Sequence, residues 1–376
     1  MKSSTVLIVA LASLSTALLR FQCSQLVVQR LDPLVDPGSI PSSHVHQIVG
    51  GVCLTHSQFW SLSLTKETRT ASTRRWILEK ICRESRRVQP AHSAKISRII
   101  GLVCSLHLFD RCIRLLRNSL AVLYFKARNG TYKRVPQKSQ ISGATAGITV
   151  YYMQDALYDT QQKSKVKSFQ HGFRMFIGDV NARSKDKVKH FRQLTYTCMD
   201  NDGTREPELL EFPKRTCPAG IMVNQRFPTC WDGVNLDSPN HMDHMAYPET
   251  GTFESQGPCP ASHPVRMPQV LFEVVWDTKA FNNKNDWPTD GSQPFVWSFG
   301  DATGYANHAD YVFGWKGNAL QRLMDTPCVV NCPAANPKTQ STAAMNKCAQ
   351  KAIVNENVDG CESNFRTPKF TLFLIT

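Results

Sequence analysis

Short apolar runs bounded by turn residues dominate the chain from residue 121 onwards. Such runs, rich in aromatic and β-branched residues and flanked by Gly, Pro, Asn or Asp, are typical of β-strands. The candidate strands cover 25–31, 121–128, 132–135, 147–153, 172–177, 192–198, 267–276, 295–299 and 311–315. Only 319–324 suggests a short helix. The pattern predicts a mainly β protein, an antiparallel β-sandwich or jelly-roll-like fold with long disulfide-stapled loops and few short helices.

A turn signal separates two of these runs. Asn129-Gly130-Thr131 lies between 121–128 and 132–135. Asn-Gly favours a tight hairpin turn, and Asn-Xaa-Thr is the acceptor sequence for N-glycosylation. We therefore predict a hairpin whose tip is glycosylated.

The N-terminus resembles a secretory signal. Lys2 precedes an apolar run over 6–19, which is too short and too rich in Ser and Thr for a good membrane span. We predict a signal peptide over 1–24, with cleavage after Ala17 or Ser24; an uncleaved anchor is the alternative. No other stretch is apolar enough to span a bilayer, so the sequence predicts a secreted protein without a membrane span after signal removal.

Thirteen cysteines fit an extracellular protein with disulfides. Cys328 and Cys332 have a spacing seen in zinc sites, but no second pair follows at ligand spacing, which favours disulfides. The eight candidates for pairing outside the N-terminal part are Cys198, Cys217, Cys230, Cys259, Cys328, Cys332, Cys348 and Cys361.

The net charge of +14 is unevenly distributed. Residues 52–119 contain thirteen Lys or Arg and four Asp or Glu, a net charge of +9, and show no clear periodicity. We interpret this segment as a gene-model artefact, such as a translated intron, because its local pattern disagrees with the rest of the chain. The alternative is a basic helical insertion that contacts an anionic polymer. The predicted organisation is one β-rich domain over 25–350, interrupted by this segment, and an atypical tail over 351–376.

The stretch from Cys230 to Gly317 is the strongest candidate for a functional site. It contains five of the seven Trp and four His, spaced among acidic residues on segments rich in Gly and Pro. Clustered aromatic and polar groups of this kind are typical of a binding cleft. The candidate ligand-binding residues are Trp231, Asp232, Trp297, Tyr311 and Trp315, although Trp more often belongs to a core.

Four residues of this stretch are candidates for acid–base catalysis: Glu273, Asp301, His308 and Asp310. Glu273 lies inside an apolar run, where an acid is either costly or functional. Asp277 is about 13 Å away along a strand, too far to act with Glu273 on one bond, so the second carboxylate would be Asp301 or Asp310. His308 and Asp310 share one face of an extended chain, which suits metal ligation or a His oriented by its neighbour for acid–base work. A buried, paired structural acid is the alternative for Glu273.

A second set of histidines could bind a divalent metal ion. His44 and His46 project to the same face of an extended chain, and His241 and His244 are spaced by about one helical turn. We name these four residues as candidate ligands; hydrogen-bonded loop histidines are the alternative. No other cofactor is predicted.

Three stretches carry a resemblance to a known family: SHVHQIVGG, CWDGVNLDSPNHMDHMAYP and FVWSFGDATGYANHADYVFGWKG. They resemble a secreted fungal family that is known only as a domain of unknown function and is sometimes fused to WSC carbohydrate-binding modules. The resemblance implies secretion and a fungal source, and it implies no established activity. Residues 52–119 and the C-terminal tail depart from the family pattern.

These observations leave the reaction open and favour three functions. The first is binding or cleavage of cell-wall or other extracellular polysaccharide. The alternatives are a non-catalytic glycan-binding module and an extracellular metal-binding protein. We expect a monomer and, because the basic charge is concentrated in one atypical segment, no nucleic-acid partner.

Overall fold

The computed structural model describes residues 18–35, 39–50, 118–139, 143–154, 166–201, 204–250, 257–325, 341–347 and 349–359. The predicted basic segment lies outside these residues except for 118–119, which begin strand β3. Most of the predicted signal peptide and the last part of the predicted tail also lie outside them.

Nine antiparallel strands form the main sheet, in the order β7-β15-β3-β2-β1-β6-β13-β9-β8. They are β1 (Leu18–Gln29), β2 (His46–Val49), β3 (Asn118–Ala121), β6 (Gly147–Met153), β7 (Arg174–Gly178), β8 (Leu194–Met199), β9 (Gly220–Arg226), β13 (Gln269–Trp276) and β15 (His308–Val312).

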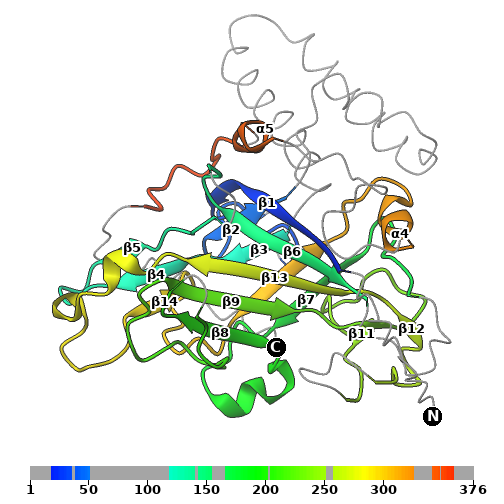
Figure 1. Cartoon of the computed structure of the whole chain (residues 1–376), viewed down its shortest axis with the longest axis horizontal. Helices are drawn as coiled ribbons and strands as arrows, with labels where there is room; N and C mark the ends of the chain where they lie inside the picture. Colours follow the sequence, from blue (N-terminus) through cyan, green and yellow to red (C-terminus); the bar gives the residue numbers. More distant parts are fainter. Residues whose placement is uncertain are drawn as a thin grey trace, which may run out of the picture.

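Strand β1 divides this sheet into two layers. Its residues Leu18–Ser24 pair with β6, whereas Gln25–Gln29 pair with β2, and the register shifts between Gln25 and Val27. Layer A therefore contains β6, β13, β9 and β8, and layer B contains β2, β3, β15 and β7. Figure 1 shows layer A in front, with strands of layer B behind it.

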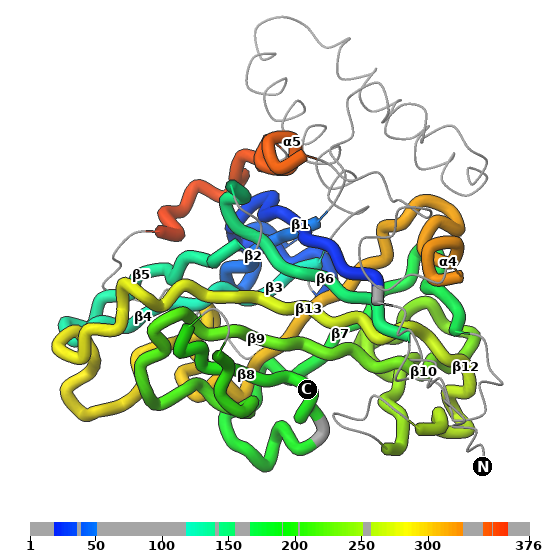
Figure 2. The backbone as a smooth tube through the Cα atoms, viewed as in Figure 1, coloured from blue at the N-terminus to red at the C-terminus, as the bar shows by residue number. Residues whose placement is uncertain are grey.

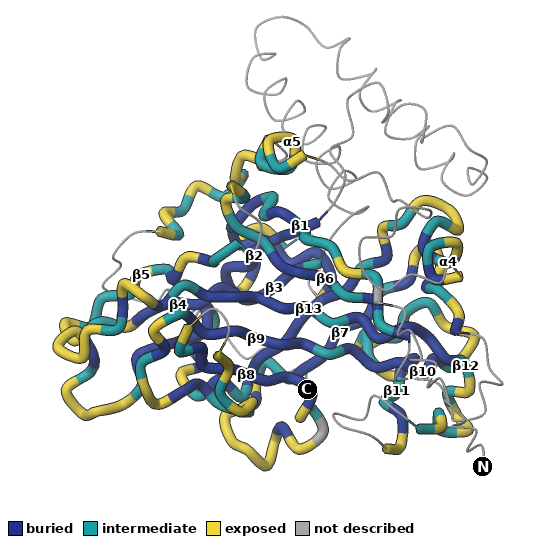
Figure 3. The backbone as a smooth tube through the Cα atoms, in the orientation of Figure 1, coloured by how far each residue is buried: buried dark blue, intermediate teal, exposed yellow. Residues whose placement is uncertain are grey.

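The core lies between the two layers. The hydroxyl groups of Tyr152 on β6 and Tyr311 on β15 are 3.0 Å apart, and the ring of Phe227 lies 6.0 Å from that of Tyr311. Side chains alternate along each strand, so those between the core positions face outward from their layer. Figure 3 shows that buried residues concentrate in the strands and exposed residues in the connecting loops.

Two small sheets and a few short helices complete the fold. One sheet contains β14 (Phe295–Trp297), β4 (Leu123–Lys126) and β5 (Tyr132–Arg134), and the other contains β11 (Met245–Ala246), β10 (Cys230–Trp231) and β12 (Val265–Arg266). The helices are α4 (Ala319–Met324), α5 (Thr342–Asn346) and the 3-10 turns Lys185–Phe191, Lys279–Phe281 and Lys284–Asp286. Disulfides join Cys198 to Cys217 and Cys230 to Cys259.

The predicted fold class is confirmed, since the chain is mainly β, with packed antiparallel layers and disulfide-linked loops. The predicted strand over 147–153 and helix over 319–324 agree with β6 and α4 at both ends. Strand β9 was not predicted. Its Met222 packs in a small outer cluster while its neighbours Ile221 and Val223 face the core, so both faces are buried and no alternation of apolar and polar residues marks it.

Residues 349–359, which include the beginning of the predicted tail, pack beside the main sheet. Beside β1, Gln350 N donates to Leu26 O at 2.7 Å, and Ile353 joins the apolar cluster that contains Ile48. Figure 2 shows α5 and the segment after it lying against the β1 side of the sheet. Residues 349–359 therefore cover part of the outer face of layer B.

Within the described ranges, no helix is long and apolar enough to cross a membrane. The first half of β1 overlaps the predicted signal peptide. Of the two predicted cleavage positions, the one after Ala17 leaves β1 whole, whereas the one after Ser24 removes the seven residues that pair with β6.

We predict that these seven residues are needed for stability. A chain that begins at Gln25 should be less stable than one that begins at Leu18 by about 3–6 kcal/mol, at roughly 1 kcal/mol per lost hydrogen bond. Urea unfolding followed by circular dichroism measures the difference, and the chain that begins at Leu18 is the matched control for removal of 1–17. Equal stability of the two chains would contradict the joining role of β1.

Candidate metal centre

Three histidines from distant parts of the sequence meet on the outer face of layer B. His46 begins β2, His44 precedes it by two residues, and His308 begins β15. Strand β3 lies between β2 and β15 in the sheet. Ala309 belongs to the core, so His308 before it faces outward, as His46 does beside the outward-facing Ile48.

The three imidazoles are close and buried. Each ring offers one nitrogen, and the three nitrogens lie within 4.8 Å of one another. The ring centroid of His44 is 4.1 Å from that of His46 and 5.4 Å from that of His308. The residues are 6% (His44), 1% (His46) and 3% (His308) exposed. We call these three residues the histidine cluster.

One nitrogen of each ring is held in place by its surroundings. His308 Nδ1 lies 3.0 Å from Ala306 O and must carry the proton, because a carbonyl oxygen only accepts. His44 Nδ1 is 3.0 Å from Ser43 Oγ, and His46 bonds to the Leu31 backbone. Such partners fix the orientation of metal-binding histidines in proteins.

The other nitrogen of each ring lacks a hydrogen-bond partner among the described residues. These atoms are His44 Nε2, His46 Nδ1 and His308 Nε2, and all three are buried. Leaving a buried polar atom without a partner costs about 1–3 kcal/mol. Three rings that each carry such a nitrogen, with ligand atoms within 4.8 Å of one another, therefore indicate that a ligand belongs there.

Burial keeps the histidine cluster uncharged at neutral pH. Desolvation is the largest cause that lowers the pKa of each ring, and it brings the pKa of His46 to about 3. Mutual repulsion adds to this, because a charge on His308 disfavours a charge on His44 or His46. Neutral imidazoles have the free lone pairs that metal ions require.

Aromatic rings form a wall beside the histidine cluster. The Phe299 ring lies 5.1 Å from both His44 and His308, and the Phe176 ring lies 5.6 Å from His308. Among the described residues, no carboxylate or thiol lies as close to all three nitrogens as they do to one another. The described residues of the site therefore offer three imidazole nitrogens as ligands.

The tail helps to position His44. Glu356 forms an ion pair with Arg30 Nε at 2.9 Å, and Arg30 Nη1 donates to the backbone oxygen of Ser43 at 2.8 Å. Ser43 is the residue whose hydroxyl contacts His44. The segment 349–359 thus supports the loop that carries one of the three rings.

The two other predicted ligands lie elsewhere. His241 Nδ1 is 2.6 Å from Asp237 Oδ1, and His244 is held between Ser238 Oγ at 2.9 Å and Arg174 O at 2.8 Å. The structure therefore brings His44 and His46 together with His308, which was predicted as a catalytic residue, and not with His241 or His244.

Glu273 lies on the other side of the molecule from the histidine cluster. Its neighbours Phe272 and Val274 face the core, so Glu273 points to the outer face of layer A. There it is 6% exposed, and its Oε2 lies 3.4 Å from Tyr151 Oη and 3.9 Å from Arg205 Nη1. The structure does not bring Glu273 together with the other predicted catalytic residues.

Asp301 and Asp310 make different contacts. The carboxylate of Asp301 accepts hydrogen bonds from the backbone N–H groups of Thr303, Gly304 and Ala306 and so closes the turn before β15. Asp310 accepts a hydrogen bond from the Ser119 hydroxyl, and burial raises its pKa well above the usual range. Asp310 shares the outer face with His308, whereas Asp301 supports the loop that leads to it.

The predicted ligand-binding aromatics serve the core in this structure. Trp297 and Tyr311 are buried, Trp231 donates to Asn235 O, and the partly buried Trp315 donates to Tyr152 Oη. A stacking role for these rings stays a prediction; in the structure Trp297 and Tyr311 are only 2% and 1% exposed. Asp232 accepts from the backbone N–H groups of the turn that follows it.

Sequence reasoning missed Phe299 and Ser43 as parts of this site. Phe299 was included in a candidate strand, and no periodicity separates an aromatic ring beside a ligand from one in a core. Ser43 directly precedes His44, and a hydroxyl next to a predicted ligand was the one available indication of a supporting contact.

We predict that the metal-free protein loses stability as the pH falls. The unfolded chain takes up protons on these histidines near pH 6.5, whereas folded His46 does so only near a pKa of about 3. The contribution of neutral His46 to the free energy of unfolding should therefore be fully present above pH 6.5. It should be lost as the pH falls from 6.5 to about 3. Urea unfolding in the presence of a chelator measures this decrease.

Replacing His46→Phe should make the decrease shallower, because one of the depressed pKa values is removed. His171→Ala, at an exposed histidine, is the control and should leave the decrease unchanged. An identical pH dependence in His46→Phe and the parent protein would show that His46 is not buried in the neutral form.

Comparison with known proteins identifies a family. The family model described as domain of unknown function (DUF1996) matches residues 120–315, which is more than half of the chain. The match includes His308 and Phe299, whereas His44 and His46 precede it. No curated protein and no solved structure matches the chain. By the extent of the family match, this chain belongs to the family described as domain of unknown function (DUF1996).

Proposed function

We propose that this protein is a secreted metal-binding protein that holds one divalent transition-metal ion through His44, His46 and His308. The observation that carries the proposal is the convergence of three buried ring nitrogens that lack hydrogen-bond partners among the described residues. One metal ion can bind all three nitrogens at once. Without a ligand, nothing among the described residues offsets the unfavourable free energy of burying these nitrogens without hydrogen-bond partners.

The donor set favours a late first-row ion. Imidazole nitrogen suits Zn²⁺, Cu²⁺ and Ni²⁺, whereas Ca²⁺ and Mg²⁺ prefer oxygen ligands. Three protein ligands leave a coordination position open, which is typical of catalytic zinc sites and not of structural ones. When bound, such an ion polarises a ligand in that position and lowers the pKa of bound water. The residues of this chain orient the imidazoles and exclude bulk water.

The secreted location rests on the N-terminal apolar run and on the disulfides. Cys198–Cys217 and Cys230–Cys259 are bonds that persist in oxidising compartments. An extracellular protein meets metal ions outside the cell, where a site with three histidines competes well for Cu²⁺ or Zn²⁺.

The predicted action on polysaccharide draws less support from the placement of the residues. Glycoside hydrolysis by an acid pair requires two carboxyl groups about 5–10 Å apart at one site. Glu273 faces outward from layer A, whereas Asp310 faces outward from layer B. Asp301 is fully buried and bonded to its own turn. Metal binding is therefore the function that the geometry supports best.

Metal titration tests the proposal. The chelator-treated protein should bind one equivalent of Zn²⁺ or Cu²⁺, measured by calorimetry and by competition with a coloured chelator. His46→Ala and His308→Ala should each weaken binding at least about 100-fold, because the loss of a ligand exceeds the 10–100-fold effect of losing a supporting contact. Binding to the folded state should also raise the unfolding temperature of the parent protein.

His241→Ala is the matched control, since His241 was an equal candidate on sequence grounds and lies outside the histidine cluster. It should bind metal as the parent protein does. Loss of binding in His241→Ala together with normal binding in His308→Ala would contradict the proposed site.

A further inference from the structure

We infer that the open position of the bound metal takes a small anion that ligates through oxygen or nitrogen, and that Arg183 at the edge of the site favours its binding. This inference rests on the proposed metal-binding function. It concerns the charge that the three histidines leave uncompensated and the guanidinium group of Arg183, which packs on Phe299. A second guanidinium near His44, that of Arg30, is paired with Glu356.

The first argument is charge balance. Three neutral imidazoles leave a divalent ion with its full charge, and no carboxylate or thiol of the described residues is placed to ligate it with them. Asp32 acts electrostatically on His44 and His308 and offsets at most one of the two positive charges, while its Oδ1 accepts from the backbone N–H groups of Leu34 and Val35. A buried charge is costly unless an opposite charge accompanies it, so an anionic ligand is favoured over a neutral one.

The second argument is size. None of the three histidines is more than 6% exposed, and the Phe299 ring packs against both His44 and His308. A polymer chain does not fit this description, whereas an anion of a few atoms does.

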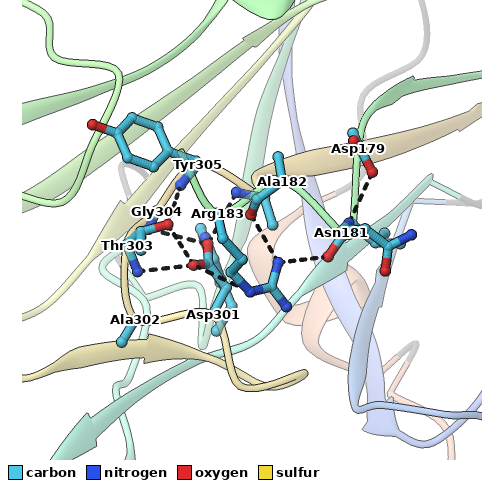
Figure 4. Close-up of polar contacts among 12 residues, drawn as sticks. Asp179, Asn181, Ala182, Arg183, Asp301, Ala302, Thr303, Gly304 and Tyr305 are labelled. Atoms are coloured by element: carbon cyan, nitrogen blue, oxygen red, sulfur yellow. Dashed lines mark hydrogen bonds and ion pairs between the residues drawn. The ribbon is translucent and has the colours of Figure 1, made fainter. Parts of the chain in front are cut away.

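The third argument is the position of Arg183. Its guanidinium carbon lies 5.8 Å from the centre of the Phe299 ring, the same ring that contacts two of the three imidazoles. Its Nη1 donates to the backbone oxygens of Val180 and Ala182, both at 2.8 Å, so the group is fixed before any ligand arrives. Figure 4 shows the guanidinium between these contacts and the Asp301 turn.

Arg183 keeps much of its charge available. Its Nε lies 3.9 Å from Asp301 Oδ1, which is beyond hydrogen-bonding distance, and its side chain is 46% exposed. The same carboxylate also accepts hydrogen bonds from Thr303, Gly304 and Ala306, so Arg183 shares it with three other residues (Figure 4). A fixed, partly exposed guanidinium on the ring that covers the metal site attracts anions toward it.

Azide binding to the Cu²⁺-loaded protein tests this inference. Azide is a small monoanion whose coordination to Cu²⁺ gives a charge-transfer absorption band, so a titration yields its dissociation constant. The parent protein should show a saturable band. Arg183→Ala should raise the azide dissociation constant about three- to tenfold while leaving Cu²⁺ affinity unchanged, in line with the loss of one charge-assisted contact.

Arg215→Ala is the matched control. The Arg215 side chain is 45% exposed, close to the value for Arg183, but it pairs with Asp200 and Glu206 away from the histidine cluster. It should leave the azide dissociation constant unchanged. Equal effects of Arg183→Ala and Arg215→Ala would overturn the role of Arg183, because they would reflect net charge alone.

The outcomes separate this inference from the proposed function. Stoichiometric Cu²⁺ uptake without an azide band would overturn the anion inference and leave the metal site intact. Failure to take up Cu²⁺ would overturn both. A saturable band that weakens only in Arg183→Ala would support both.

Discussion

The backbone pairing of β1 is the constraint on which the rest of the structure depends. One strand pairs with β6 through its first half and with β2 through its second half, so a single chain segment belongs to both layers. The turn of the sheet at this strand brings the two apolar faces together around Tyr152 and Tyr311. The outer face of layer B, where the histidine cluster lies, has its position because β2 is paired to this strand.

Burial of the histidine cluster destabilises the fold, but it leaves nitrogen lone pairs that a metal ion can accept. Three imidazoles lose their hydration, and each keeps one nitrogen without a partner among the described residues. Contacts from Ser43, Ala306 and the Leu31 backbone already orient the rings. Binding of an ion therefore requires little further loss of side-chain entropy. Because β3 separates β2 from β15, a bound ion would also cross-link two strands that do not pair with each other. Under the proposed function, metal binding would therefore be coupled to folding.

The sequence predicted the fold class and half of the site for clear physical reasons. Alternation and turn residues identify strands with one solvent-facing side, and residues two apart on a strand share a face, which correctly paired His44 with His46. Neither rule predicts which distant strand lies two positions away in a sheet. His308 was therefore listed among the catalytic residues, with metal ligation as an alternative, and His241 and His244 were grouped with the metal ligands on local spacing alone.

The sequence pattern also failed to predict which aromatic side chains are buried. The stretch from Cys230 to Gly317 is rich in aromatics, which suggested a cleft, but Trp297 and Tyr311 fill the space between the layers. Glu273 was correctly identified as an acid within an apolar strand, and the alternation of that strand directs it away from the histidine cluster. The sequence shows which residues of a strand share a face. Which of the two faces packs in the core depends on how both layers pack together.

The central claim is that His44, His46 and His308 bind one metal ion. Anomalous diffraction from crystals of the Zn²⁺-loaded protein, measured on both sides of the zinc absorption edge, tests it most directly. We expect one strong zinc peak about 2.0–2.1 Å from a nitrogen of each of the three rings. A peak bound instead by His241 or His244, or zinc uptake without any peak at the histidine cluster, would contradict the claim.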